Sequence, residues 1–177
     1  MTKRIFLYGF AFGSLLALST FIYFENQLYK DFLQDTLGGK ILPIIIQMVG
    51  VGLAIVAVKK SEGNYITMAR AGFVGLMISI VMGIFSSFFY YVYTNQKPEK
   101  LLALKDAYKY RTAQVYEKPE NKGKISEKDF NEKIKAIDYY YVPSQQMKLE
   151  MFRIMSVALI AAGAFGFMLK REPTIKP

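Results

Sequence analysis

The chain has 177 residues, of which 53% are hydrophobic, 15% are aromatic and only 21% are charged; this composition departs from that of soluble domains in the direction of membrane proteins. It contains no Cys and no His, which excludes disulfides, thiol nucleophiles and thiolate metal sites and leaves only carboxylates to bind a metal. The formal charge is +9, but the basic residues lie at the ends of apolar segments and in one mixed-charge segment, so anionic lipid headgroups explain them better than nucleic acid does.

The first apolar segment, residues 5–24, follows Lys3 and Arg4. Such a start is also typical of a secretory signal peptide, with Ala17-Leu18-Ser19 as a passable cleavage site. The apolar run is 20 residues long, which exceeds a typical signal core, so we predict a retained membrane span.

A polar loop, residues 25–40, separates the first two spans and contains one amphipathic turn around Leu28, Phe32 and Leu33. The second predicted span covers residues 41–58 and ends before two lysines. Its short connection to the third span predicts a two-helix hairpin in the membrane.

The third predicted span, residues 71–93, has no charged side chain in 23 residues, enough to cross a hydrocarbon core about 30 Å thick. Arg70 precedes it, and Tyr90, Tyr91 and Tyr93 end it. We predict that Arg70 and the tyrosines anchor this span at the two membrane interfaces.

Residues 94–148 form the longest polar segment and predict a helical hairpin outside the membrane. One helix is expected over residues 98–117 and the other over residues 126–142, with Ser126 as N-cap. The second helix has one apolar stripe at helical spacing, made of Phe130, Ile134, Ile137 and Tyr141. That stripe is expected to pack on the first helix.

Residues 149–177 are predicted to contain the fourth span, at about residues 150–169, and the tail that follows it. Glu150 and Arg153 lie in its first turn, where long side chains reach the interface and a pair three residues apart can form. Just before this span, Tyr139, Tyr140 and Tyr141 predict a second aromatic belt.

Lys and Arg in the short loops predict the orientation. The first loop has Lys30 and Lys40 against three acidic residues, whereas the other short segments are more basic. Those basic residues are Lys3, Arg4, Lys59, Lys60, Arg70, Lys170, Arg171 and Lys176. We therefore predict a multi-pass protein of a bacterial inner membrane, with cytoplasmic termini and an extracytoplasmic hairpin over residues 94–148.

Small residues recur at helix-packing spacing in three of the spans, which allows close approach of helix backbones. They are Gly9 and Gly13, then Gly75, Ser79 and Gly83, then Ala158, Ala162 and Gly166. They predict packing within one bundle, with a homo-oligomer or partner interface as the alternative.

Few side chains suggest chemistry. Gln47 is the one strongly polar residue deep in a span other than Ser and Thr, and a hydrogen bond within the bundle is its expected role rather than a substrate contact. The carboxylates of the hairpin alternate with lysines, as on a solvated helix face, and no nucleophile, phosphate-loop or zincin motif accompanies them. These carboxylates are Glu117, Glu120, Glu127, Asp129 and Glu132. We predict no catalytic residue, no cofactor and no metal.

Three segments resemble a family of small bacterial inner-membrane proteins known as a domain of unknown function. They are NYITMARAGFVGLMIS from Asn64, FFYYVYTNQKPEKL from Phe88 and KISEKDFNEKIKAIDYYYVPSQQM from Lys124, and the likeness covers nearly the whole chain. Met68 and Arg70 depart from the family pattern. The resemblance implies four spans and supplies no catalytic residues.

The sequence thus predicts an all-α integral membrane four-helix bundle with an extramembrane helical hairpin between the third and fourth spans. The expected partners are the lipid bilayer and either a protein or a second copy of the chain, and no nucleic acid. The preferred function is that of a non-catalytic scaffolding subunit of a cell-envelope complex. A small transporter or channel component is one alternative, and an accessory subunit of a polyprenyl-phosphate glycosyltransferase is another.

Overall fold

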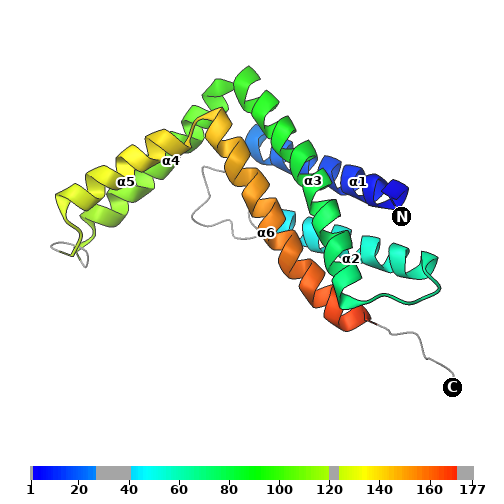
Figure 1. Cartoon of the computed structure of the whole chain (residues 1–177). Helices are drawn as coiled ribbons and strands as arrows, with labels where there is room; N and C mark the ends of the chain where they lie inside the picture. The colour runs from blue at the N-terminus through cyan, green and yellow to red at the C-terminus, as the bar shows by residue number, and fades with distance from the viewer. Residues whose placement is uncertain (1, 27–40, 120–123, 171–177) are drawn as a thin grey trace.

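The computed structural model describes residues 2–26, 41–119 and 124–170, and in these ranges the chain forms six helices and no strand (Figure 1). Four of the helices are long and apolar enough to cross a membrane. They are α1 (Thr2–Glu25), α2 (Leu42–Ser61), α3 (Met68–Gln96) and α6 (Pro143–Leu169), while α4 (Pro98–Glu117) and α5 (Glu127–Tyr140) form the hairpin. The predicted all-α fold class is confirmed, and the chain is a multi-pass membrane protein.

Parts of the sequence prediction lie outside the described residues. They are the amphipathic turn around Leu28, Phe32 and Leu33, the loop lysines Lys30 and Lys40, the carboxylate Glu120, and the tail residues Arg171 and Lys176.

Two of the span helices are longer than the apolar runs on which their prediction rested. α3 begins at Met68 rather than at residue 71, because the side chain of Thr67 accepts a hydrogen bond from the Arg70 backbone N–H at 3.2 Å and caps the helix. α6 begins at Pro143 rather than near residue 150. Proline suits a first helical turn, where its missing N–H needs no partner. Pro143 therefore separates α5 from α6 and starts the last span outside its apolar part.

The hairpin helices follow the pattern in the sequence. The Ser126 side chain accepts a hydrogen bond from the Asp129 backbone N–H at 3.1 Å, which confirms the predicted N-cap. The Phe130 ring stacks on Tyr116 of α4 with centroids 4.5 Å apart, so the apolar stripe of α5 packs on α4 as expected.

The bundle is organised around the pair α3 and α6, which pack along most of their lengths. α1 packs on α3 and on α2, and α2 also packs on α6. Fully buried apolar side chains from all four spans fill the centre, among them Leu16, Ile55, Ile78, Met82 and Ile154.

Glycines set the closeness of these contacts. A Cβ atom added at Gly75 would lie 2.1 Å from the Cβ of Ala162, and one at Gly83 would lie 2.4 Å from the Met151 sulfur, so α3 approaches α6 closely at both points. On α1, Gly9 faces Val81 of α3 in the same way.

The other predicted packing residues also lie inside the bundle. Gly13 contacts α3 at Met82 and Phe85, Gly166 contacts Ala71, and Ser79, Ala158 and Ala162 are buried. The small residues thus lie at helix contacts within one chain, and an interface with a second copy or a partner through them stays a prediction.

The two ends of the bundle differ in character. At the end opposite the hairpin, Arg4 of α1 donates to the Ala57 carbonyl oxygen of α2 at 2.8 Å, and the Lys59 Nζ atom donates to the Leu169 carbonyl oxygen of α6 at 2.9 Å. Both cations satisfy carbonyl groups in the last turns of helices, where a positive charge is favoured. At the other end α3 passes into α4 at Lys97 and Pro98, and the hairpin runs off to one side of α3 and α6 instead of continuing their direction (Figure 1).

Candidate functional site

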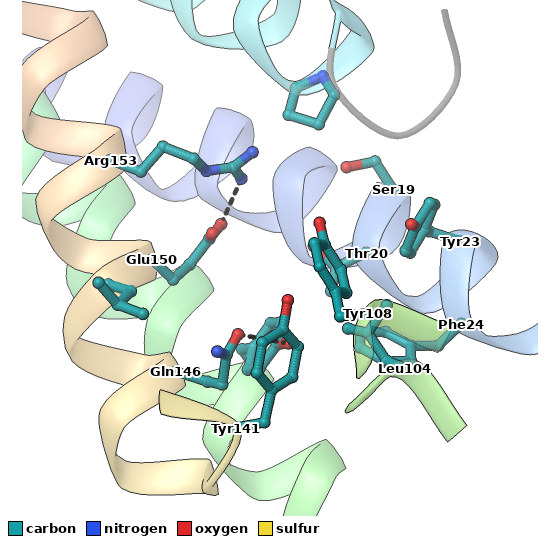
Figure 2. Close-up of a pocket in the computed structure, with 13 residues that line it drawn as sticks. Ser19, Thr20, Tyr23, Phe24, Leu104, Tyr108, Tyr141, Gln146, Glu150 and Arg153 are labelled. Carbon is teal, nitrogen blue, oxygen red and sulfur yellow. Dashed lines mark hydrogen bonds and ion pairs between the residues drawn. The ribbon is translucent and has the colours of Figure 1, made fainter. Parts of the chain in front are cut away.

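A cavity of about 270 Å³ lies at the hairpin end of the bundle, where the four spans meet α4 and the α5–α6 junction (Figure 2). We call it the hairpin-end cavity. Its walls combine aromatic rings with polar and charged groups. The lining residues are Ser19, Thr20, Tyr23, Phe24, Pro43, Tyr90, Leu104, Tyr108, Tyr141, Gln146, Leu149, Glu150 and Arg153.

An ion pair on α6 forms one wall of the cavity. Arg153 donates from Nη2 to Glu150 Oε1 at 2.7 Å, which is the pair that the three-residue spacing allows. Glu150 is only 9% exposed, and the Nε atom of Arg153 is buried with no hydrogen-bond partner in the described part of the chain. The two residues point from α6 toward Ser19, Thr20 and Tyr23 on α1 (Figure 2). The sequence predicted exposed anchors here, but Glu150 is a buried carboxylate that faces a cavity.

Tyrosines from α3, from α4 and from the α5–α6 junction close the side of the cavity next to the hairpin. Tyr90 of α3 donates a hydrogen bond to Gln146 Oε1 at 3.2 Å, and the rings of Tyr108 and Tyr141 lie 5.1 Å apart. Burial raises the pKa of the Tyr108 and Tyr141 hydroxyls, so both stay protonated at neutral pH and can donate hydrogen bonds.

A cluster around Glu25 fixes the hairpin to the bundle beside this cavity. Glu25, at the end of α1, accepts a hydrogen bond from the Tyr93 hydroxyl at 2.8 Å and pairs with Lys97. Lys100 Nζ lies 3.4 Å from its second oxygen. The end of α1 therefore holds both sides of the α3–α4 junction.

Below the cavity the bundle is apolar. Leu16, Met82 and Ile154 lie one or two helical turns further in and are fully buried. Gln47 is also fully buried there, one turn beyond Pro43 on α2, and both of its side-chain polar atoms lack a hydrogen-bond partner in the described structure. The described structure therefore does not contain the hydrogen bond predicted for Gln47.

The predicted interfacial anchors fall into two groups. Tyr90 and Tyr93 are buried in the protein, as is part of Tyr141, because α1 and α4 cover them. Arg153 lines the cavity, whereas Arg70 pairs with Glu62 at 2.9 Å on the surface. Among the predicted anchor tyrosines, Tyr91, Tyr139 and Tyr140 are exposed, and their contact with the membrane interface stays a prediction.

The sequence interpretation did not select several lining residues. Tyr23, Thr20 and Ser19 lie in an apolar run, where no periodicity shows which face turns inward. Tyr108 and Gln146 lie in polar segments, where such residues are common. Ser19, Thr20 and Tyr23 lie within the last two turns of α1 and Gln146 lies in the first turn of α6, whereas Tyr108 lies in the middle of α4.

The carboxylates of the hairpin do not gather into a site. Glu117, Glu127, Asp129 and Glu132 are all exposed. Within the described ranges, no three His, Cys, Asp or Glu residues lie close enough together to hold a metal ion.

Comparison with known families gives one match. A family model described as "Protein of unknown function (DUF4199)" matches residues 7–171. No curated protein and no solved structure matches the chain.

Proposed function

Since the chain belongs to the DUF4199 family, whose description names no activity, we propose its function from its geometry: it is a non-catalytic interaction subunit of a membrane complex, and its hairpin is the docking element. The observation that carries this proposal is the way the hairpin is attached. Glu25 links α1 to both sides of the α3–α4 junction through Tyr93, Lys97 and Lys100. A docking element held in one orientation loses little conformational entropy when a partner binds.

The surface of the hairpin supports the same function. Tyr110 is 66% exposed in the middle of α4, and Leu102 is exposed on the same helix. Exposed aromatic side chains outside the spans are typical of protein contacts, where tyrosine is enriched. The hairpin helices also hold each other firmly through the Tyr116–Phe130 stack, so this surface does not depend on a partner for its shape.

The orientation proposed with this function places the hairpin outside the cytoplasm. The basic residues described at the other end of the bundle lie at or next to the ends of the span helices, within the reach that the positive-inside rule weighs. They are Lys3, Arg4, Lys59, Lys60, Arg70 and Lys170, with Glu62 as the acidic residue among them. This distribution supports cytoplasmic termini in a bacterial inner membrane.

Photocrosslinking in living cells tests the docking role. A photoreactive amino acid at Tyr110 should give a discrete adduct with one other protein, whereas the same group at Ile160, which is 75% exposed on α6 among apolar neighbours, should not give that adduct. If the Tyr110 position gave no protein adduct in the native membrane, the docking role would be wrong.

Cysteine labelling tests the orientation separately. Because the chain has no natural Cys, Lys128→Cys and Lys60→Cys each give one labelling site, on the hairpin and at the opposite end. A reagent that does not cross the membrane should label Lys128→Cys in intact cells and Lys60→Cys only after lysis. The reverse pattern would overturn the orientation.

A further inference from the structure

We propose that the hairpin-end cavity binds a phosphoethanolamine group, with its ammonium on Glu150 and its phosphate on Arg153. Membrane phospholipids carry this group as a headgroup. This inference does not depend on the docking role of the hairpin. It rests on an incomplete ion pair, on the rings around it and on the level of the cavity in the bundle.

The ion pair leaves polar groups for a ligand. Arg153 and Glu150 meet through one nitrogen and one oxygen, while Arg153 Nε is buried and has no partner in the described structure. A buried donor such as Arg153 Nε that has no partner costs free energy, and a ligand that adds hydrogen bonds to this ion pair can offset that cost. A phosphate oxygen can accept from the free edge of the guanidinium, and an ammonium group can donate to the carboxylate.

The two opposite charges select a ligand that carries both. An anion alone would be attracted by Arg153 but repelled by Glu150, and a cation alone would be attracted by Glu150 but repelled by Arg153. Residues three apart on a helix have Cβ atoms about 5–6 Å apart. The two-carbon link of ethanolamine separates its phosphate from its ammonium by a similar distance, so each charge can reach its counterpart.

The rings of the cavity suit the ammonium end. Tyr23, Phe24, Tyr90, Tyr108 and Tyr141 line the same cavity as Glu150, and ammonium groups bind to the faces of such rings. The hydroxyls of Ser19 and Thr20 donate to the Leu16 carbonyl oxygen, so their oxygens remain able to accept a further hydrogen bond.

The level of the cavity suits a headgroup. Its residues come from the last turns of α1 and α3, the first turns of α2 and α6, and the adjoining α4 and Tyr141. The apolar spans give way to polar segments at this end of the bundle, and headgroups flank the hydrocarbon core of a bilayer. Its volume of about 270 Å³ holds a headgroup but not a whole lipid, and the apolar layer of Leu16, Met82 and Ile154 closes it on the membrane side.

Native mass spectrometry of the full chain in detergent tests the proposal. Delipidated protein is given phosphatidylethanolamine and phosphatidylglycerol with matched acyl chains, and in a separate arm soluble phosphoethanolamine. We expect an ethanolamine-lipid adduct favoured over the glycerol lipid by about tenfold, equivalent to about 1.4 kcal/mol. A lipid adduct without a soluble adduct identifies a membrane lipid as the ligand, an adduct with soluble phosphoethanolamine identifies the free group, and equal retention of both lipids would overturn the proposal.

Two variants sharpen this test. Glu150→Gln removes the negative charge that repels an anionic headgroup. The lipid preference of this variant should therefore move from the ethanolamine lipid toward the glycerol lipid. Arg70→Gln breaks an ion pair of similar length at the opposite end of the bundle and should leave the preference unchanged. An unchanged preference in folded Glu150→Gln contradicts the proposal. If that variant does not fold, the comparison of lipids on the natural chain still decides.

Discussion

The carboxylate of Asp138 on α5 holds the Lys109 Nζ atom on α4 with both of its oxygens, at 2.7 Å from Oδ1 and 2.8 Å from Oδ2. Lys105 Nζ lies 3.4 Å from the same carboxylate. One residue near the end of α5 thus ties down two successive turns of α4. The Lys109 hydrogen bond is the main reason that the pKa of Asp138 is lower than usual.

This contact predicts an acid-sensitive hairpin. A carboxyl group whose pKa is lowered by folding stabilises the fold above its unfolded pKa of about 3.9, and this contribution is lost as the pH falls through the lower folded pKa. We expect the amide protection factors in α4 and α5, which compare the observed exchange with the intrinsic exchange at the same pH, to fall below about pH 4. Asp138→Asn should weaken this pH dependence where α5 contacts α4, and protection there should already be lower at neutral pH. Asp106→Asn changes an exposed carboxylate of the same hairpin and should keep the pH dependence of the natural chain. Equal pH profiles of Asp138→Asn and the natural chain would contradict the role of Asp138.

Two glycines of α3 provide a matched test of packing. Gly75→Ala places a Cβ atom 2.1 Å from the Cβ of Ala162, so α3 and α6 must move apart, at a cost of about 1–3 kcal/mol. Gly72→Ala meets nothing within 4 Å and should leave stability unchanged or raise it by up to about 1 kcal/mol through helix propensity. Denaturation of the purified chain in detergent measures both. Similar midpoints for the two variants would show that the contact of α3 with α6 is less close than described.

The buried amide of Gln47 predicts a stabilising substitution. Leaving a buried polar group without a partner costs about 1–3 kcal/mol. Gln47→Met keeps the approximate length of the side chain and removes both unpaired polar atoms, so we expect it to raise the denaturation midpoint in detergent. A lower midpoint would mean that the amide has a partner in the membrane, such as a buried water.

The N-cap of α5 predicts a local effect in the hairpin. Ser126→Ala removes the acceptor of the Asp129 backbone N–H and should destabilise the start of α5 by about 1 kcal/mol. Ser126→Asp keeps an oxygen at that position and should retain most of the stability. Amide exchange in the first turn of α5 distinguishes the two, and equal exchange rates would contradict a capping role.

How far the sequence could predict this structure depends on the kind of helix. α5 has one apolar stripe on an otherwise charged surface, so its inward face and its partner helix followed from spacing alone. The spans are apolar on every side, and a uniformly apolar helix carries no signal for its inward face. The sequence could therefore place Tyr90 and Glu150 near the end of a span, but it could not show that both are buried.

The cavity was beyond sequence prediction for a related reason. Its polar groups come from α1, α3, α4 and α6, and they meet only because α4 turns aside at Lys97 and Pro98 and covers the end of the bundle. The Glu25 cluster that holds this turn joins residues about seventy positions apart, and no local pattern marks such a pair. Small residues at helix contacts could be predicted because their spacing lies within a single helix.

The sideways course of the hairpin determines where its tip can reach (Figure 1). α4 has 20 residues, so at 1.5 Å per residue it extends about 30 Å from its base. Because α4 runs to one side of α3 and α6, most of this distance lies lateral to the bundle. Under the docking role proposed above, a hairpin of this course would serve a partner that stands beside the bundle rather than beyond its end.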